Sequence, residues 1–343
     1  MIERDNRRVL VTGGNGFVGW SLCEELLHRG YQVRAAVRSL GQLPSGMESV
    51  AVGAIDGGTD WNKAMVGVDI VIHLAARVHV MKDSSSDPLA EFLKVNLHGT
   101  ANLAQQAVRA GVKRLVYASS VKVNGESTSA SDTLSPGPSP VSGGGGQNIF
   151  TESDNPNPQD PYGVSKWQAE QALRHIAQET GLEIVIVRPP LVYGPGVKGN
   201  FASLLAAINQ GIPLPLAGAR NARSLVYVGN LVDALIACAT HPAAAGQTYL
   251  VSDGDDVSTA RLTEKIASAL GRNSRSFYFP PLLLRAAATL LGRAGQMDRL
   301  FGSLRVSDKK IRGELGWSPP YTLEQGLRET AVWYRARQSR RVS

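Results

Sequence analysis

The 343-residue sequence predicts an α/β protein in which a doubly wound parallel sheet is joined to a smaller C-terminal α/β lobe. Three observations predict this class. Short apolar strand patterns alternate with helical patterns over the first half of the chain. A glycine-rich turn separates the first strand pattern from the first helical one. Beyond residue 196 this alternation gives way to short strands mixed with helices.

Composition and charge restrict the function classes. Residues 1–8 are charged and lack an apolar signal region, and no apolar run reaches membrane-spanning length, so we expect a cytoplasmic protein without membrane insertion. The net charge is +7, but outside the two chain ends the basic residues are scattered, which argues against nucleic acid and suits an anionic small molecule. Cys23 and Cys238 lie in apolar helical patterns, so we expect buried thiols and no metal site.

The first strand pattern, residues 8–12, runs directly into Gly13-Gly-Asn-Gly16-Phe-Val-Gly19 and a helical pattern to about residue 29. Gly13 permits the tight turn, Gly16 lets the backbone approach a pyrophosphate at the helix N-terminus, and Gly19 permits close packing of helix on strand. The turn therefore predicts a dinucleotide site.

The second strand pattern, residues 32–37, ends at Arg38. In dinucleotide-binding folds a carboxylate near this point binds the ribose 2′-hydroxyl, whereas an arginine accommodates a 2′-phosphate. No acid occurs between Arg38 and Glu48, and Arg34 lies close to Arg38 in the sequence. We therefore predict NADP(H), bound by Arg38 with help from Arg34; the alternatives are NAD(H) and a solvated Arg38.

The next strand patterns, residues 49–54, 69–74 and 113–119, carry polar or small residues to the same edge of the sheet. Asp56 follows the first of them, near the expected adenine. His73 ends the second and is expected to be packed or hydrogen-bonded rather than catalytic. Ser120 follows the third, where its hydroxyl could bind a substrate oxygen. A long helical pattern, residues 88–110, lies between the last two.

Tyr162 and Lys166 open a helical pattern that runs to Thr180. Residues four apart stand on one helix face, one turn above the other. A phenol has a pKa near ~10, and a neighbouring ammonium favours its ionised form, so the pair could act as one acid/base device. The alternative is a helix start with a solvated lysine. Residues 126–159, rich in serine, proline and glycine, predict a long loop just before this helix.

The later part of the chain begins after the strand pattern of residues 183–188 and Pro189. Strands are expected at residues 225–228 and 248–251, and helices at 231–240, 259–270, 283–291 and 323–337. We therefore divide the chain into a dinucleotide-binding domain, residues 1–188, and a part that is mainly a substrate lobe, residues 189–343, some of whose elements return to the first domain.

In this order and spacing, the motifs resemble those of the extended short-chain dehydrogenase/reductases, in the nucleotide-sugar epimerase/dehydratase group. The resemblance continues through Arg188-Pro-Pro-Leu-Val-Tyr-Gly-Pro195, Asn200-Phe201, residues 223–233 and residues 307–317. It implies a Rossmann domain, a nucleotide-sugar substrate and a homodimer formed through the helices at residues 88–110 and 162–180. It also implies Tyr162 as acid/base, Lys166 as its partner and ribose ligand, and Ser120 as the hydroxyl that orients the sugar oxygen.

The resemblance and the turn geometry together give two sets of expected binding residues. Cofactor contacts are expected from Gly13, Gly16, Phe17, Val18, Gly19, Arg38, Asp56, Leu74, Ala75, Ala76, Asn96, Lys166 and Pro189. Substrate contacts are expected from Lys122, Asn124, Asn200, Arg223 and Arg299, with Arg305 as a further candidate, because a guanidinium suits diphosphate oxygens.

Three positions depart from the family pattern. Ser120-Val-Lys122 replaces Thr-Asp-Glu, which disfavours a dehydratase. Asn124 replaces the usual tyrosine and implies a differently lined sugar pocket. Asn230 stands where an aspartate is usual, and the sequence does not predict its effect.

We predict an NAD(P)(H)-dependent oxidoreductase acting at C4 of a UDP-hexose, of a kind used in surface polysaccharide assembly. Net reduction of a 4-keto sugar is preferred, because an arginine that selects NADPH, Asn124 and a loop that could open all suit a cofactor consumed each cycle. The first alternative is 4-epimerisation of a UDP-hexose or UDP-N-acetylhexosamine. The second is a non-catalytic dinucleotide-binding sensor, which the presence of Ser120, Tyr162 and Lys166 together opposes.

Overall fold

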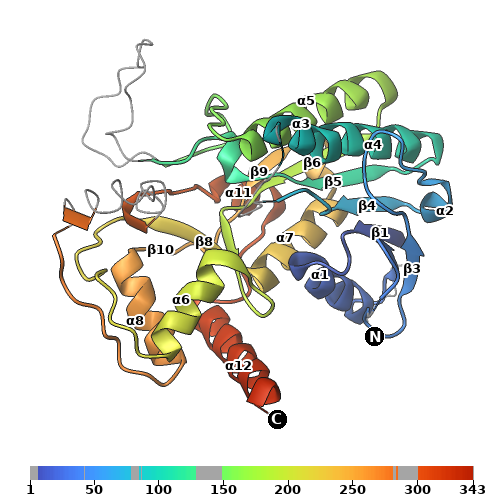
Figure 1. Ribbon diagram of the computed structural model, residues 1–343. Coiled ribbons are helices and arrows are strands. Elements are labelled where there is room, and N and C mark those ends of the chain that lie inside the picture. The colour runs from blue at the N-terminus through green and yellow to red at the C-terminus, as the bar shows by residue number, and fades with distance from the viewer. Residues whose placement is uncertain are drawn as a thin grey trace.

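A seven-stranded parallel sheet forms the centre of the molecule (Figure 1). The computed structural model describes residues 7–41, 43–78, 85, 87–128, 149–280, 283–284 and 300–342. The strand order is β3-β2-β1-β4-β5-β6-β9, and each of its pairings is parallel. The strands are β1 Arg8–Thr12, β2 Gln32–Val37, β3 Glu48–Ala51, β4 Ile70–His73, β5 Arg114–Ala118, β6 Glu183–Arg188 and β9 Thr248–Leu250. The predicted fold class is confirmed.

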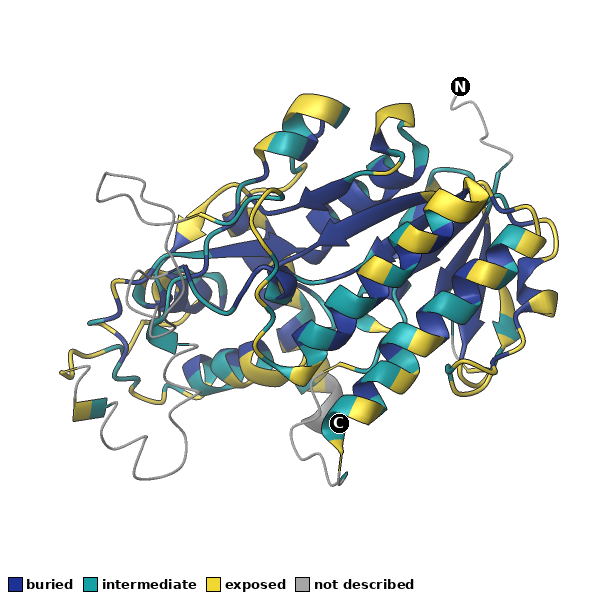
Figure 2. Cartoon of the chain, turned by 90° about the horizontal axis from the view of Figure 1, so that it is seen from above, coloured by how far each residue is buried: buried dark blue, intermediate teal, exposed yellow. Residues whose placement is uncertain are grey.

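Helices cover both faces of this sheet, and apolar strand residues are buried between the layers (Figures 1 and 2). On one face lie α2 (Asn62–Met65), α3 (Pro88–Leu93), α4 (Thr100–Arg109) and α5 (Pro161–Thr180). On the other lie α1 (Phe17–His28) and α7 (Val228–Thr240), which contact each other. Strands buried on both faces need near-continuous apolar sequence, and this is what residues 70–73 and 184–187 provide.

The strand order reverses between β1 and β4, which lie side by side with Thr12 opposite His73. In open parallel sheets, ligands bind beyond the carboxyl ends of the strands at such a reversal. The loops after β1, β2, β4 and β5 therefore converge on one edge.

The helical pattern at residues 88–110 is not uniform. Asp87 caps its start, accepting a hydrogen bond from the Ala90 N–H at 3.0 Å, and α3 and α4 are joined by a π-helical turn, η1 (Lys94–Gly99). Such turns are often found at functional sites, and this one carries Asn96.

The C-terminal half contributes to both parts of the molecule. A small sheet, β10-β8-β7, lies apart from the large one and consists of β7 (Leu191–Tyr193), β8 (Arg223–Tyr227) and β10 (Asp256–Val257). The helices α6 (Gly199–Asn209), α8 (Thr259–Ala269) and α12 (Leu323–Val342) accompany it (Figure 1). In contrast, β9 is a strand of the large sheet, and α7 packs against that sheet. The helix α11 (Lys309–Leu315) and the 3-10 turn η3 (Pro242–Ala244) pack beside them.

Two predicted segments fall partly outside the described residues. Of the helix predicted at residues 283–291, only 283–284 are described, and of the loop at 126–159 the part 129–148 is not. The described ends of that loop pair with the segment before α11: the Thr128 N–H donates to the Ser303 carbonyl, and Phe150 bridges Val306.

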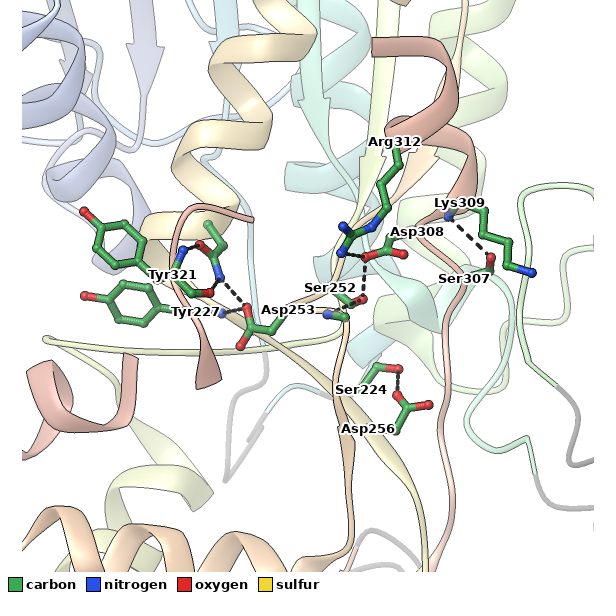
Figure 3. A network of polar contacts seen from close by, with 12 residues as sticks. Ser224, Tyr227, Ser252, Asp253, Asp256, Ser307, Asp308, Lys309, Arg312 and Tyr321 are labelled. Carbon is green, nitrogen blue, oxygen red and sulfur yellow. Dashed lines mark hydrogen bonds and ion pairs between the residues drawn. The ribbon is translucent and has the colours of Figure 1, made fainter. Parts of the chain in front are cut away.

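A buried polar network around Asp253, which follows β9 of the large sheet, connects this segment to β7 and β8 of the small sheet (Figure 3). It also explains Asn230. One Asp253 oxygen accepts from the Tyr227 N–H and the Asn230 amide, both at 2.7 Å, and the other accepts from the Tyr193 hydroxyl at 2.8 Å. The Asn230 amide also exchanges two hydrogen bonds with the backbone of Tyr321. An aspartate at position 230 would place a second carboxylate against Asp253 and could not donate to it.

Both cysteines are buried and unpaired, as expected. Within the described ranges, no helix is long and apolar enough to span a membrane, and the same residues contain no cluster of three His, Cys, Asp or Glu side chains suited to a metal.

Candidate active site

The glycine turn after β1 leaves no room for side chains. Gly13 has φ +70°, and a Cβ there would lie 3.1 Å from the Ala75 backbone nitrogen. A Cβ on Gly19 would lie 2.1 Å from the Gly13 carbonyl oxygen, and one on Gly16 3.0 Å from the same atom. Helix α1 starts with Gly16 as a cap that offers no side-chain acceptor, and its first turn carries no acid. Its N–H groups and dipole thus suit a diphosphate, so the residues present fit a dinucleotide cofactor.

A buried hydroxyl–imidazole chain fixes the loop opposite this turn. Thr12 Oγ1 accepts from the Leu74 and Ala75 N–H groups, each at 3.1 Å, and lies 2.6 Å from His73 Nδ1. The Thr12 hydroxyl therefore donates its own proton to His73 Nδ1, and His73 Nε2 then donates to Thr100 Oγ1 at 2.9 Å. Burial, with a smaller effect from the Lys166 charge, lowers the pKa of His73 to about 3. His73 is a neutral structural residue that places Leu74, Ala75 and Ala76 against the glycine turn.

Asn96 secures the same loop from the other side. Its amide pairs with the Arg77 backbone, accepting at 2.8 Å and donating at 3.0 Å, and also donates to Ser165 Oγ at 2.9 Å. The side chain is fully buried. Asn96 thus holds the loop after β4 against α5. Its buried side chain supports this loop, so its role toward a cofactor would be indirect.

Arg34, within β2, and Arg38, just beyond it, lie in different surroundings. Arg38 is exposed just beyond the strand, at the edge where a ribose would lie. Arg34 is buried: its guanidinium donates to the Ala64 and Val66 carbonyls at 2.8 and 2.7 Å and pairs with Glu48 at 3.0 Å. The expected help from Arg34 is therefore wrong, because Arg34 lies within β2, four residues before Arg38, and its guanidinium is bound to these carbonyls and to Glu48.

The remaining predicted cofactor residues lie around the same edge. Phe17, in the first turn of α1, contacts Gly196. Asp56, beyond β3, accepts from the Gly58 N–H at 2.9 Å, which shapes the turn there. Pro189 follows β6, is buried, and accepts from the Val121 N–H at 3.0 Å.

Ser120, Tyr162 and Lys166 come together where β5 ends and α5 begins. The Ser120 hydroxyl lies close enough to the Tyr162 phenol to lower its pKa. The Lys166 ammonium lies 5.9 Å from the centroid of the Tyr162 ring and 4.4 Å from that of Tyr117, and donates to the Ala118 carbonyl at 2.7 Å. Asp160 and Pro161 explain why α5 starts here: the carboxylate accepts from the Gly163 N–H at 2.7 Å, and proline suits the first helical position.

Burial governs the charges of this pair. It lowers the pKa of Lys166 to about 7, although the nearby Glu170 acts in the opposite direction. Burial, and then the charge of Asp160, raises the pKa of Tyr162, while the Ser120 hydroxyl lowers it. The sequence predicts that the ammonium favours the phenolate, but among the protein's own groups desolvation outweighs that effect. The surroundings that the protein itself supplies therefore favour the protonated phenol.

Below the pair lies a buried ion pair that the sequence analysis missed. The Arg188 guanidinium donates to both oxygens of Glu170, at 2.9 and 2.6 Å, and Ser119 Oγ donates to the same carboxylate at 2.5 Å. Glu170 is fully buried and Arg188 is 2% exposed. An arginine at the end of an otherwise apolar strand, and a glutamate four residues after Lys166, were the available signals.

The predicted substrate residues divide into three groups. Asn124 is corrected: it is 2% exposed, donates to the Thr151 carbonyl at 2.9 Å and accepts from Arg188 at 3.0 Å, so it lies in the interior and not in a sugar pocket. Lys122 is bound to two carboxylates of the protein, Glu126 and Asp160. These are contacts within the protein, and the predicted contact of Lys122 with substrate stays a prediction.

The third group lies in the C-terminal lobe. Asn200 is exposed in the first turn of α6, and Arg223 begins β8 and donates to the Gly302 carbonyl at 3.0 Å. Arg305 pairs with Asp256 at 2.6 Å. Arg299 lies outside the described residues. Their convergence on a diphosphate stays a prediction.

Comparison with known proteins adds the following. The model of the NAD dependent epimerase/dehydratase family matches residues 9–252. A UDP-glucose 4-epimerase of Vibrio cholerae is 41% identical over 327 residues, covering 95% of this chain and 94% of the relative. The structure of MoeE5 with UDP-glucose and NAD superposes with a TM-score of 0.73 at 26% identity, over 96% of this chain and 99% of that one. A UDP-glucose 4-epimerase of Thermotoga maritima with UDP-glucose, at 23% identity and a TM-score of 0.74, covers 96% of this chain and 99% of its own and shares the fold.

Proposed function

Because the chain belongs to the NAD-dependent epimerase/dehydratase family, we propose that it is a UDP-hexose 4-epimerase that uses a tightly held nicotinamide dinucleotide. The observation that carries the proposal is that the Ser120 hydroxyl and the Lys166 ammonium both lie beside the Tyr162 phenol, at the edge where the glycine turn opens. The Vibrio cholerae relative, a UDP-glucose 4-epimerase by name, supports the same reaction.

In the proposed reaction the chain's residues move one proton at the C4 oxygen of the sugar. Ser120 orients the C4 hydroxyl and Tyr162 removes its proton; the same phenol returns the proton to the oxygen of the 4-keto sugar after the sugar has turned over. Lys166 lies within reach of both the phenol and the expected ribose. When bound, a nicotinamide would supply the acceptor and donor of the C4 hydride, and in its oxidised form a positive charge that would favour the phenolate.

Net reduction of a 4-keto sugar is the second candidate. It is favoured by Arg38, exposed at the end of β2 where a 2′-phosphate of NADPH would lie. The other arguments for reduction are weaker than the sequence suggests: Asn124 is interior, and residues 129–148 lie outside the described chain. Epimerisation therefore stands first and reduction second.

A substrate panel separates the two. Purified protein is given UDP-glucose, UDP-N-acetylglucosamine and a UDP-4-keto-6-deoxyhexose in turn, with and without NAD(H) or NADP(H). Conversion of a hexose to its C4 epimer without net consumption of cofactor supports the proposal. Stoichiometric oxidation of NADPH by the keto sugar alone would replace it with the reductase. Turnover of none of the three, in protein shown to bind the cofactor, would favour the sensor.

We also propose a homodimer through α4 and α5, whose outward faces are exposed (Figure 2), with the C-terminal lobe as the part that selects the sugar. Sedimentation equilibrium of the wild type tests the dimer, and a monomer at micromolar concentration would contradict it.

A further inference from the structure

Lys122 forms a bridge between two carboxylates beside the acid/base pair. It lies in the 3-10 turn η2 (Val121–Val123), two residues after Ser120. Its ammonium contacts Glu126 Oε1 at 2.7 Å and forms a short hydrogen bond to Asp160 Oδ2. The three side chains are only 22 to 29% exposed, so water screens the contacts less than it would on an open surface.

Asp160 uses its two oxygens on different elements. Oδ1 accepts from the Gly163 N–H at 2.7 Å and caps α5, and Oδ2 binds Lys122. One carboxylate therefore ties the first turn of α5 to η2. A charged cap also complements the dipole of a 20-residue helix.

The bridge closes a ring around the reacting groups. Tyr162 stands in the first turn of α5 with its phenol beside Ser120, while Ser120 Oγ accepts from the Lys122 N–H at 3.3 Å. The segments of Ser120 and Tyr162 thus meet twice, once where the phenol lies beside Ser120 and once through the ion pair between Lys122 and Asp160. Two contacts fix the relative position of two segments more tightly than one does.

We propose that Lys122 is a positioning residue: by bridging to Asp160 it holds Ser120 and Tyr162 in reacting geometry and offsets the negative charge beside the phenol. This deepens the proposed function and rests on it for the kinetic part. The family-based expectation differs, since it assigns Lys122 to the substrate.

The charges around the phenol agree with this role. After burial, Asp160 is the cause that raises the pKa of Tyr162, so an opposite charge held on Asp160 limits that rise. Other groups also surround the Tyr162 ring. Tyr117 of β5 and Lys166 of α5 lie beside the ring, and the charge of Glu170 acts on Lys166. Phe92 of α3 packs edge-on against the Tyr162 ring, and the Arg77 guanidinium lies over Phe92. Asp160 itself is paired with the ammonium of Lys122.

The test is a double-mutant cycle of Lys122→Met and Asp160→Asn, read by kinetics and by denaturation. Asparagine keeps the helix cap but removes the charge. We expect Lys122→Met to lower kcat about ten- to hundredfold, because small displacements of reacting groups cost this much. We also expect the rise of kcat/KM with pH to move up by roughly one unit, since the uncompensated carboxylate disfavours the phenolate. In the double variant the pH limb should return close to its wild-type position.

Controls keep the result specific. Lys122→Arg should retain most of the activity, since it preserves the charge. Lys265→Met removes a lysine of the same 22% exposure that pairs with Glu324 on α8 and α12, and should leave both kcat and the pH profile unchanged.

Three results would overturn the proposal: a higher KM at unchanged kcat in Lys122→Met, which would mark a substrate contact; an unmoved pH limb; or additive effects of the two substitutions on the denaturation midpoint. The denaturation cycle needs no substrate. A wild type without turnover would therefore refute the proposed function, while coupling or its absence in the midpoints would still decide the role of Lys122.

Discussion

Replacing Arg188 by methionine should be among the most destabilising single changes available in this chain. The substitution removes a guanidinium that donates to both oxygens of Glu170 and a third bond to Asn124 Oδ1. Because Glu170 is fully buried, water cannot replace these donors. The Ser119 hydroxyl still donates to the carboxylate, and Arg174 lies 3.9 Å from it. Removing one partner of such a pair costs about 3–5 kcal/mol.

The assay is urea denaturation followed by circular dichroism, with the free energy of unfolding compared between variants. Arg261→Met, which breaks an exposed pair with Glu264, is the matched control and should cost about 0.5 kcal/mol or less. The double variant Glu170→Met/Arg188→Met should recover most of the loss, because it leaves no buried charge unpaired. A loss below about 1 kcal/mol for Arg188→Met would refute the reasoning, since it would mean that Glu170 is solvated or protonated at little cost.

Three further predictions follow from the site. Tyr162→Phe should lower kcat by about 10²- to 10⁴-fold and leave cofactor affinity nearly unchanged in titration calorimetry; near-normal kcat would rule out the acid/base assignment. Lys166→Met should stabilise the protein most below pH 7: burial lowers the pKa of this lysine from 10.5 to about 7, so the folded state bears the cost of a buried charge below pH 7 and sheds it as the pH rises towards 10.5. Urea denaturation between pH 6 and about 10 checks this, and a stability difference independent of pH would contradict it. Arg38→Ala should weaken NADP(H) binding by roughly tenfold to a hundredfold and leave NAD(H) unaffected, and equal wild-type affinities for both cofactors would show that Arg38 is only solvated.

Local features of the site could be read from the sequence because their geometry is local. Gly13, Gly16 and Gly19 must lack a Cβ, and the structure shows why, since a Cβ at Gly19 would fall 2.1 Å from the Gly13 carbonyl oxygen. Tyr162 and Lys166 share a helix face because helical spacing alone requires it. Alternating strand and helix patterns fixed the sheet class for the same reason, and the family follows from these motifs in their order.

The partner of each polar side chain was decided only by the tertiary structure. Arg34 and Arg38 read alike in sequence, yet one is buried against Ala64 and Val66 while the other is exposed. Asn124 reads as a pocket residue and instead accepts from Arg188, 64 residues further along the chain.

The same holds for the groups around the phenol. Ser120 meets Tyr162, and Lys122 meets Asp160, because the turn η2 that follows β5 packs against α5. Periodicity reports which face of an element is apolar, whereas hydrogen bonds and ion pairs depend on which elements the strand order sets side by side. The sequence by itself therefore determined the fold class, the turn and the helix pair, and the packing of sheet and helices determined which charges those residues meet.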